Sequence, residues 1–214
     1  MNTDIVSYYR DRANEYEQIY SKPERQNDLH TAKQFLQNIF TGKEVFEIAC
    51  GTGYWTEIIS LKAKQILATD INDTVVEIAK AKNYPATNVH FKIEDIFKLT
   101  TKVKHESLFG GFIWSHIKLQ DLNNFVNKVN SFVEPGGTIV FMDNNYVESS
   151  SLPLSDSEDD GNTYQIRTLT NATKHKVLKN FPTEEFIRQL LFAKAHNISF
   201  INLQYYWILK YTPV

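Results

Sequence analysis

The sequence predicts an α/β fold in which a seven-stranded, mostly parallel sheet carries helices on both faces and ends in an antiparallel strand. Short apolar runs alternate with helical segments between residues 45 and 142, which is the order of β-α-β units in a parallel sheet. A β-rich stretch at residues 198–211 can add two final strands. The 214 residues suffice for one domain with its own core, so the fold requires no disulfide or metal.

The first forty residues predict two helices before the sheet begins. Residues 4–20 place tyrosines and isoleucines at spacings that share one helical face. Pro23 interrupts this pattern, and residues 28–40 predict a second helix that ends near Gly42.

Five strands and three helices are expected in the next hundred residues. The strands are assigned from apolar runs and the helices from 3.6-residue spacing. We expect strands at residues 45–50, 65–69, 89–93, 108–114 and 138–142, and helices at residues 55–61, 73–83 and 119–132.

The pattern changes after Asn145. A polar and acidic stretch at residues 148–162 favours a loop, and residues 163–169 can pair with residues 175–179 as a hairpin. Thr183 is a candidate N-cap for a helix that runs to about residue 195.

Composition excludes several classes of protein. The 23 Lys and Arg residues nearly balance the 25 Asp and Glu residues, which argues against a nucleic-acid partner. No stretch has the ~18 consecutive apolar residues of a membrane span, and residues 1–10 lack the apolar region of a secretory signal. We therefore expect a cytoplasmic protein without a membrane partner. Cys50 is the single cysteine, which rules out a disulfide framework or a cysteine-rich zinc site.

A glycine turn and two acids point to a ligand site at one edge of the sheet. Gly51 and Gly53 lie where the first strand turns into a helix, and such a turn lets a ligand approach the backbone. Asp70 follows the second strand, where a carboxylate can accept both hydroxyls of a ribose, and Asp95 follows the third. Each feature alone is also typical of an ordinary turn or helix cap. Together they converge on one crevice.

The turn favours an adenosine ligand without a pyrophosphate. A dinucleotide site needs a third glycine at position 56, where this chain has Thr56, and Tyr54 leaves little room for phosphates. The chain also lacks a Gly-Lys-Ser/Thr phosphate loop. An NAD-dependent oxidoreductase is therefore disfavoured.

These motifs resemble the class I S-adenosylmethionine-dependent methyltransferases. Residues 45–53, Val-Phe-Glu-Ile-Ala-Cys-Gly-Thr-Gly, look like the first motif of that family, with Ala49 in place of its first glycine. Asp70 matches the acid that binds the ribose in that family, and Asp95-Ile96 matches the pair of residues that contacts the adenine. Residues 132–138 match the Pro-Gly-Gly signature before the fifth strand. The resemblance covers about residues 40–145 and implies a Rossmann-like fold.

The resemblance also implies roles and a division of the single domain 1–214. Residues 1–40 would form a helical lid, 41–146 the cofactor core, 147–182 an inserted loop and hairpin on the acceptor side, and 183–214 the closing helix and strands. The cofactor would be S-adenosyl-L-methionine, with S-adenosyl-L-homocysteine as product. The implied cofactor residues are Tyr16, Glu47, Ala49, Gly51, Gly53, Asp70, Ile71, Asp95, Ile96 and Trp114.

The acceptor and its chemistry are less constrained by sequence. His116 follows the fourth strand where a general base could stand, although a role in shaping the cofactor pocket is equally compatible. The strand end reads Ile-Trp-Ser-His and not Asn/Asp-Pro-Pro-Tyr, which argues against transfer to adenine or glutamine nitrogens. Asp143-Asn144 lacks the partner acid that a metal-dependent O-methyltransferase needs, so no metal is expected.

A small molecule is the expected methyl acceptor. Tyr146, Tyr164 and Arg167 lie in or beside the candidate hairpin, and such a set could hold an anionic or aromatic compound. An RNA or protein methyltransferase of the same fold, or a binding module without activity, remains an alternative. The sequence does not identify the acceptor, the atom that is methylated or the oligomeric state.

Overall fold

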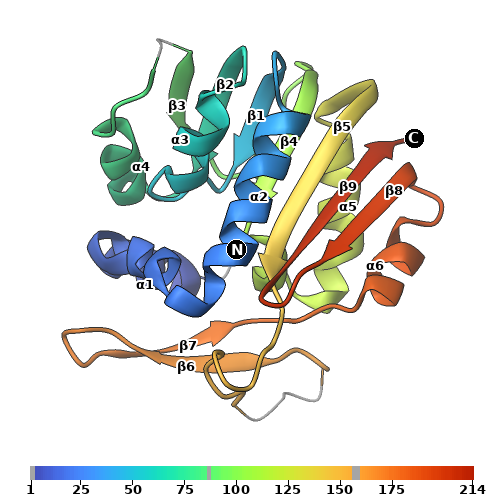
Figure 1. Ribbon diagram of the computed structural model, residues 1–214. Coiled ribbons are helices and arrows are strands. Elements are labelled where there is room, and N and C mark those ends of the chain that lie inside the picture. Colours follow the sequence, from blue (N-terminus) through green and yellow to red (C-terminus); the bar gives the residue numbers. More distant parts are fainter. Residues whose placement is uncertain (1–2, 86–87, 156–159) are drawn as a thin grey trace.

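The alternating pattern folds into a seven-stranded sheet in the computed structural model of the chain, which describes residues 3–85, 88–155 and 160–214 (Figure 1). The strand order is β3-β2-β1-β4-β5-β9-β8. The first five strands run parallel, and β9 is antiparallel to both β5 and β8, as predicted. The strands are β1 (Glu44–Ile48), β2 (Gln65–Asp70), β3 (Val89–Ile93), β4 (His105–Gly111), β5 (Val133–Asn144), β8 (Ala195–Asn202) and β9 (Tyr206–Pro213).

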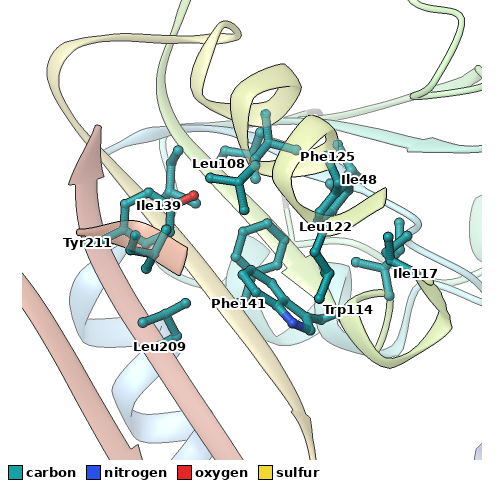
Figure 2. Close-up of a cluster of buried hydrophobic side chains, with 14 of the residues drawn as sticks. Ile48, Leu108, Trp114, Ile117, Leu122, Phe125, Ile139, Phe141, Leu209 and Tyr211 are labelled. Atoms are coloured by element: carbon teal, nitrogen blue, oxygen red, sulfur yellow. The ribbon is translucent and has the colours of Figure 1, made fainter. Parts of the chain in front are cut away.

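Helices flank this sheet and account for two apolar clusters. One cluster joins α5 and α6 to one face and includes Trp114, Phe125 and Phe141 (Figure 2). The other joins α2 and α3 to the sheet through side chains such as Leu36 and Ile59. The α-helices are α1 (Thr3–Asp11), α2 (Gln26–Ile39), α3 (Tyr54–Ser60), α4 (Asp73–Lys80), α5 (Leu122–Asn130) and α6 (Glu184–Leu191).

The expected helix over residues 4–20 is wrong in its second half. From Ala13 to Ser21 the chain winds as a 3₁₀ helix, η1, instead of continuing α1. Tertiary contacts fix this segment: Trp55 Nε1 donates a hydrogen bond of 3.0 Å to the Tyr20 hydroxyl, and the Tyr20 ring stacks on Tyr54. These contacts with α3 are not encoded in local spacing.

Two other expected boundaries also shift. The fourth strand ends at Gly111 and not at Trp114, because Phe112 takes a φ of 59° and the chain then forms a 3₁₀ turn, η3 (Trp114–His116). Pro135-Gly136-Gly137 lies inside β5 rather than in a turn before it, at a register shift against β4. Thr183 caps α6 as predicted, accepting a hydrogen bond from Phe186 N.

The predicted hairpin forms outside the main sheet. Its strands β6 (Tyr164–Thr168) and β7 (Lys174–Leu178) are antiparallel and lie below the carboxyl ends of the parallel strands, next to α1 (Figure 1). Ile5 and Tyr8 of α1 pack with Tyr164, Val177 and Leu178 in a small apolar cluster. Residues 156–159 of the expected inserted segment lie outside the described residues. No helix in the described ranges has the length and apolar character to cross a membrane.

Candidate cofactor and acceptor site

The loop between β1 and α3 brings its backbone to the edge of a cavity. Ala49, Gly51 and Gly53 have φ values of 53°, 55° and 78°, in the left-handed region. Glycine is required at position 53, since a Cβ there would stand 2.8 Å from the Tyr84 hydroxyl and 2.9 Å from the Ala79 Cβ. Ala49 and Gly51 line the cavity, whereas Gly53 supports the turn from behind.

Asp70, at the end of β2, is the acid best placed to hold a polar ligand. Its carboxylate accepts backbone hydrogen bonds from Gly51 N at 3.0 Å and from Asn72 N at 2.9 Å. Burial raises the pKa of Asp70, and these backbone donors oppose that rise. The two bonds fix the carboxylate in the cavity wall, where it retains acceptor capacity toward a ligand hydroxyl.

The same cavity offers an apolar slot with a second acid beside it. Ile71 and Ile96 both line it, on segments that follow β2 and β3. Asp95 also lines it, and its Oδ1 accepts a hydrogen bond of 3.0 Å from Phe97 N. Two aliphatic side chains and two carboxylates suit a flat, polar-edged base joined to a sugar.

Glu47 is buried within β1 and is not part of the cavity lining. Its side chain is 1% exposed, and within the described part of the chain its Oε2 makes no hydrogen bond. Burial, with the nearby charge of Asp70, raises the pKa of Glu47 to about 8. A buried carboxyl of this kind is neutral at pH 7 and would ionise if a cation were placed beside it.

The N-terminal helices form a lid over the cavity. Ile5, Val6, Tyr9 and Tyr16 line it from this side. Asn72 Nδ2 donates to the Val6 carbonyl at 3.2 Å, which ties α1 to the end of β2. The lid therefore covers the cavity with apolar and aromatic side chains.

A second contact holds η1 to the glycine loop. The hydroxyl of Thr52 donates a hydrogen bond of 2.6 Å to Glu17, and Lys82 Nζ pairs with the same carboxylate at 2.6 Å. These two contacts hold η1 against the glycine loop and the segment that follows α4.

His116, on η3, also lines the cavity, and both of its ring nitrogens have partners. Nδ1 donates to the Leu178 carbonyl at 2.6 Å, because a carbonyl can only accept. The Tyr9 hydroxyl then donates to Nε2, also at 2.6 Å. Burial and the nearby charges of Lys179 and Arg167 hold the pKa of His116 well below its usual range. The neutral ring thus links lid, η3 and hairpin.

The comparisons with known proteins agree with this geometry. Residues 45–137 match the methyltransferase domain family. Malonyl-[acyl-carrier protein] O-methyltransferase 2 of Ilyobacter polytropus is 32% identical over 119 residues, which are 52% of this chain and 44% of that protein. Phosphoethanolamine N-methyltransferase 1 of Arabidopsis thaliana is 24% identical over 113 residues, 51% of this chain and 23% of that protein. The matches thus span less than half of either relative's length.

A solved structure extends the likeness to nearly the whole chain. The DhpI–SAM–HEP complex is 25% identical with a TM-score of 0.82, covering 98% of this chain and 96% of that one. The chain is therefore similar, in its whole fold and in the sequence of residues 45–137, to the class I S-adenosylmethionine-dependent methyltransferases. The Rossmann-like sheet order and the ligand cavity at its carboxyl edge are those predicted from the resemblance.

The first cavity contains seven of the ten predicted cofactor residues. The seven that line it are Tyr16, Ala49, Gly51, Asp70, Ile71, Asp95 and Ile96. Glu47 and Gly53 lie behind the lining. Trp114 is 1% exposed and packs against Phe141 and Trp207 in the core, so its ring does not face the cavity (Figure 2).

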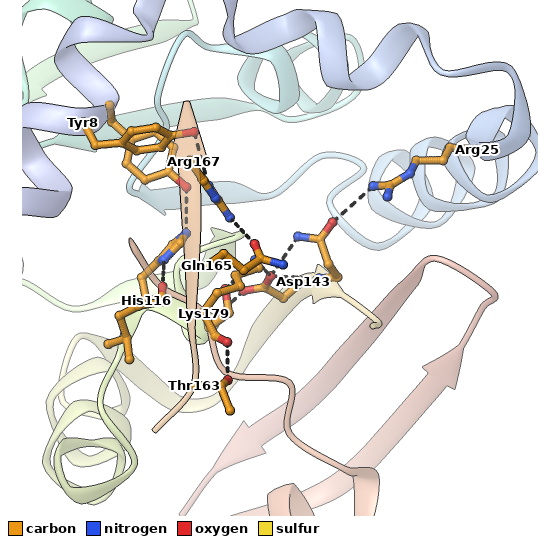
Figure 3. A network of polar contacts seen from close by, with 12 residues as sticks. Tyr8, Arg25, His116, Asp143, Thr163, Gln165, Arg167 and Lys179 are labelled. Atoms are coloured by element: carbon orange, nitrogen blue, oxygen red, sulfur yellow. Dashed lines mark hydrogen bonds and ion pairs between the residues drawn. The ribbon is translucent and has the colours of Figure 1, made fainter. Parts of the chain in front are cut away.

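A second cavity lies between the N-terminal helices and the hairpin. Arg167, one of the predicted acceptor residues, lines it, and Arg12, Arg25 and Lys179 line it as well. Tyr164 is buried against α1 and does not line this cavity. Tyr146 is 40% exposed and contacts Phe181 instead. Figure 3 shows Arg167, Lys179 and Arg25 approaching from different elements.

Lys179 was missed by sequence reasoning, because a single lysine after an apolar strand carries no signal. Its Nζ donates to Asp143 at 2.8 Å and to the Ser115 hydroxyl at 2.6 Å, and the lysine is 4% exposed (Figure 3). Asp143 also accepts from Ser115 N and Asn144 N. Within residues 3–85, 88–155 and 160–214 no group of three or more His, Cys, Asp or Glu side chains is arranged to hold a metal ion.

Proposed function

We propose that this protein transfers the methyl group of S-adenosylmethionine to a small-molecule acceptor. The observation that carries the proposal is the Asp70 carboxylate, held by Gly51 N and Asn72 N in the wall of a cavity that also contains Ile71 and Ile96. Asp70 would accept the ribose hydroxyls, and the two isoleucines would enclose the adenine. The relatives described above are named as methyltransferases that act on oxygen or nitrogen, which supports this reaction class.

The methionine end of the cofactor would lie toward the glycine loop and Tyr16. Its ammonium group would be the cationic partner of the buried Glu47 carboxyl. Glu47 would act either directly or through a water, since it lies behind the lining.

The chemistry needs little from the protein beyond positioning. The acceptor's lone pair forms a bond to the methyl carbon as the S–CH₃ bond breaks, and that electron pair returns to sulfur, leaving a neutral thioether. The sulfonium is already an activated leaving group, so alignment and exclusion of water supply the rate enhancement. The lid and its aromatic side chains exclude water. Because both ring nitrogens of His116 are hydrogen-bonded, we assign it the role of positioning Tyr9 beneath the lid rather than that of general base.

Asp70→Asn tests the cofactor assignment. Loss of a charge-assisted hydrogen bond should weaken S-adenosylhomocysteine binding by about 1.5–3 kcal/mol, or roughly 10- to 150-fold, in titration calorimetry. Asp73→Asn is the matched control, since Asp73 is an exposed acid on the next helix and does not line the cavity. Equal affinities for the two variants would refute the assignment of Asp70 to the ribose.

A further inference from the structure

The residues that line the second cavity carry an excess of positive charge. Among the described residues that line it, Arg12, Lys22, Arg25, Arg167 and Lys179 are cationic and Glu15 alone is acidic. Its volume of about 410 Å³ lies in the range of small-molecule sites. The net charge of the whole protein is only −2, so this concentration of cations is a local feature.

The arginines in this cavity are held by neutral groups and not by carboxylates. In the described part of the chain, no Asp or Glu oxygen lies within 4.0 Å of Arg12, Arg25 or Arg167, in contrast to Arg188, which pairs with Glu184 at 2.8 Å. Arg25 instead donates to the Ser150 hydroxyl at 3.0 Å and lies over the Tyr205 ring.

Arg167 is the best-oriented of these cations. One terminal nitrogen donates to Gln165 Oε1 at 3.1 Å, another approaches the Tyr8 hydroxyl at 3.5 Å, and the guanidinium lies over the Tyr8 ring. Its Nε is buried and has no hydrogen-bond partner among the residues that the structure describes. A buried guanidinium donor without an acceptor is costly, and an oxyanion would supply the missing acceptor (Figure 3).

The cationic cavity adjoins the proposed cofactor cavity. Tyr9, Tyr16 and Phe112 line both. A compound anchored at Arg167 could therefore reach a methyl group presented near Tyr16 without leaving the covered space beneath the lid.

We infer that the methyl acceptor is a small oxyanion, a compound with a carboxylate or phosphate group that Arg167 binds with help from Arg12 and Arg25. Lys179 is a weaker anchor because Asp143 neutralises it. This inference rests on the proposed methyl transfer. An acceptor whose own anionic oxygen attacks carries no proton to lose, which agrees with a site in which His116 is fully hydrogen-bonded and neutral.

Titration calorimetry with inorganic phosphate and with acetate tests the anion site. The protein is saturated with S-adenosylhomocysteine, and sodium chloride keeps the ionic strength constant. Wild type should bind at least one of the two anions, and Arg167→Gln should weaken that binding tenfold or more. Binding of phosphate but not acetate would indicate an acceptor with a phosphate group, and binding of acetate but not phosphate an acceptor with a carboxylate. Either result supports the inference.

Arg188→Gln is the control, since Arg188 is an exposed arginine on α6 that lines neither cavity. Arg167→Lys provides a second variant with the charge retained and the planar donor set removed. Equal anion affinities for Arg167→Gln and Arg188→Gln, or no binding of either anion to wild type, would overturn the inference. S-adenosylhomocysteine binding is measured in the same samples without anion, so its loss would count against the proposed function alone.

Discussion

Replacing Lys179 by methionine should destabilise the fold, because it leaves the buried Asp143 carboxylate without its ion-pair partner. Asp143 is 0% exposed and Lys179 is 4% exposed, and the two groups are 2.8 Å apart. Burial tends to raise the pKa of Asp143, but the neighbouring charge of Lys179 and the hydrogen bonds from Lys179 and Ser115 N outweigh it and hold that pKa below its usual value. Methionine fills a similar volume, so the main loss is the ion pair and the hydrogen bond to Ser115.

The expected destabilisation at pH 7 is roughly 3–5 kcal/mol, the usual result of removing one partner of a buried ion pair. Ser115 N and Asn144 N still donate to Asp143, which places the value toward the lower end of that range. Urea denaturation followed by circular dichroism gives the free energy of unfolding. Lys174→Met is the control, because Lys174 is an exposed residue of the same hairpin and has no acidic partner among the described residues. It should change stability by less than about 0.5 kcal/mol.

The pH dependence identifies the source of the loss. In the Lys179→Met variant, the pKa of Asp143 in the folded protein should lie above its pKa in the unfolded chain. The carboxylate then destabilises the fold at pH values above the unfolded-state pKa, and this penalty disappears as the carboxyl is protonated at lower pH. The difference from wild type should therefore shrink between pH 7 and pH 4. Adding Asp143→Asn to Lys179→Met should recover part of the stability at pH 7. A difference that stays constant with pH, together with no recovery in the double variant, would refute the argument and indicate lost packing instead.

Two further predictions concern the cofactor cavity. Because burial raises the pKa of Glu47 to about 8, the folded state retains a proton that the unfolded chain releases near pH 4, so stability falls as pH rises between these values. Glu47→Gln should reduce the difference in unfolding free energy between pH 5 and pH 8, measured by urea titration. It should also weaken S-adenosylhomocysteine binding at pH 8. Identical stability profiles against pH for variant and wild type would contradict this prediction. If His116 acts by positioning Tyr9, His116→Ala and Tyr9→Phe should each weaken S-adenosylhomocysteine binding several-fold in calorimetry. A different result would make His116 the general base: intact binding in both variants, with single-turnover methyl transfer reduced ~10²-fold or more only in His116→Ala.

Local sequence signals were sufficient to predict most of the fold, and most of the residues chosen for the cofactor line the first cavity. Strands alternating with helices predicted the sheet, because apolar periodicity reports directly which face each element buries. That the glycine turn, Asp70 and Asp95 lie around one cavity could be predicted because each follows the end of a parallel strand, and chain order alone determines that position. The N-cap Thr183 and the β6–β7 hairpin that precedes it in the sequence were also predicted from local signals.

The tertiary structure alone decided where the distant charges meet. Arg12, Arg25, Arg167 and Lys179 come from the lid, the start of α2 and the hairpin, and nothing in their local sequence relates them. The change from α-helix to 3₁₀ helix at Ala13 likewise depends on stacking against α3. Sequence determines local periodicity and turn chemistry, because these act between near neighbours. The set of residues that line a cavity between elements depends on packing between segments far apart in the sequence, which only the folded structure establishes.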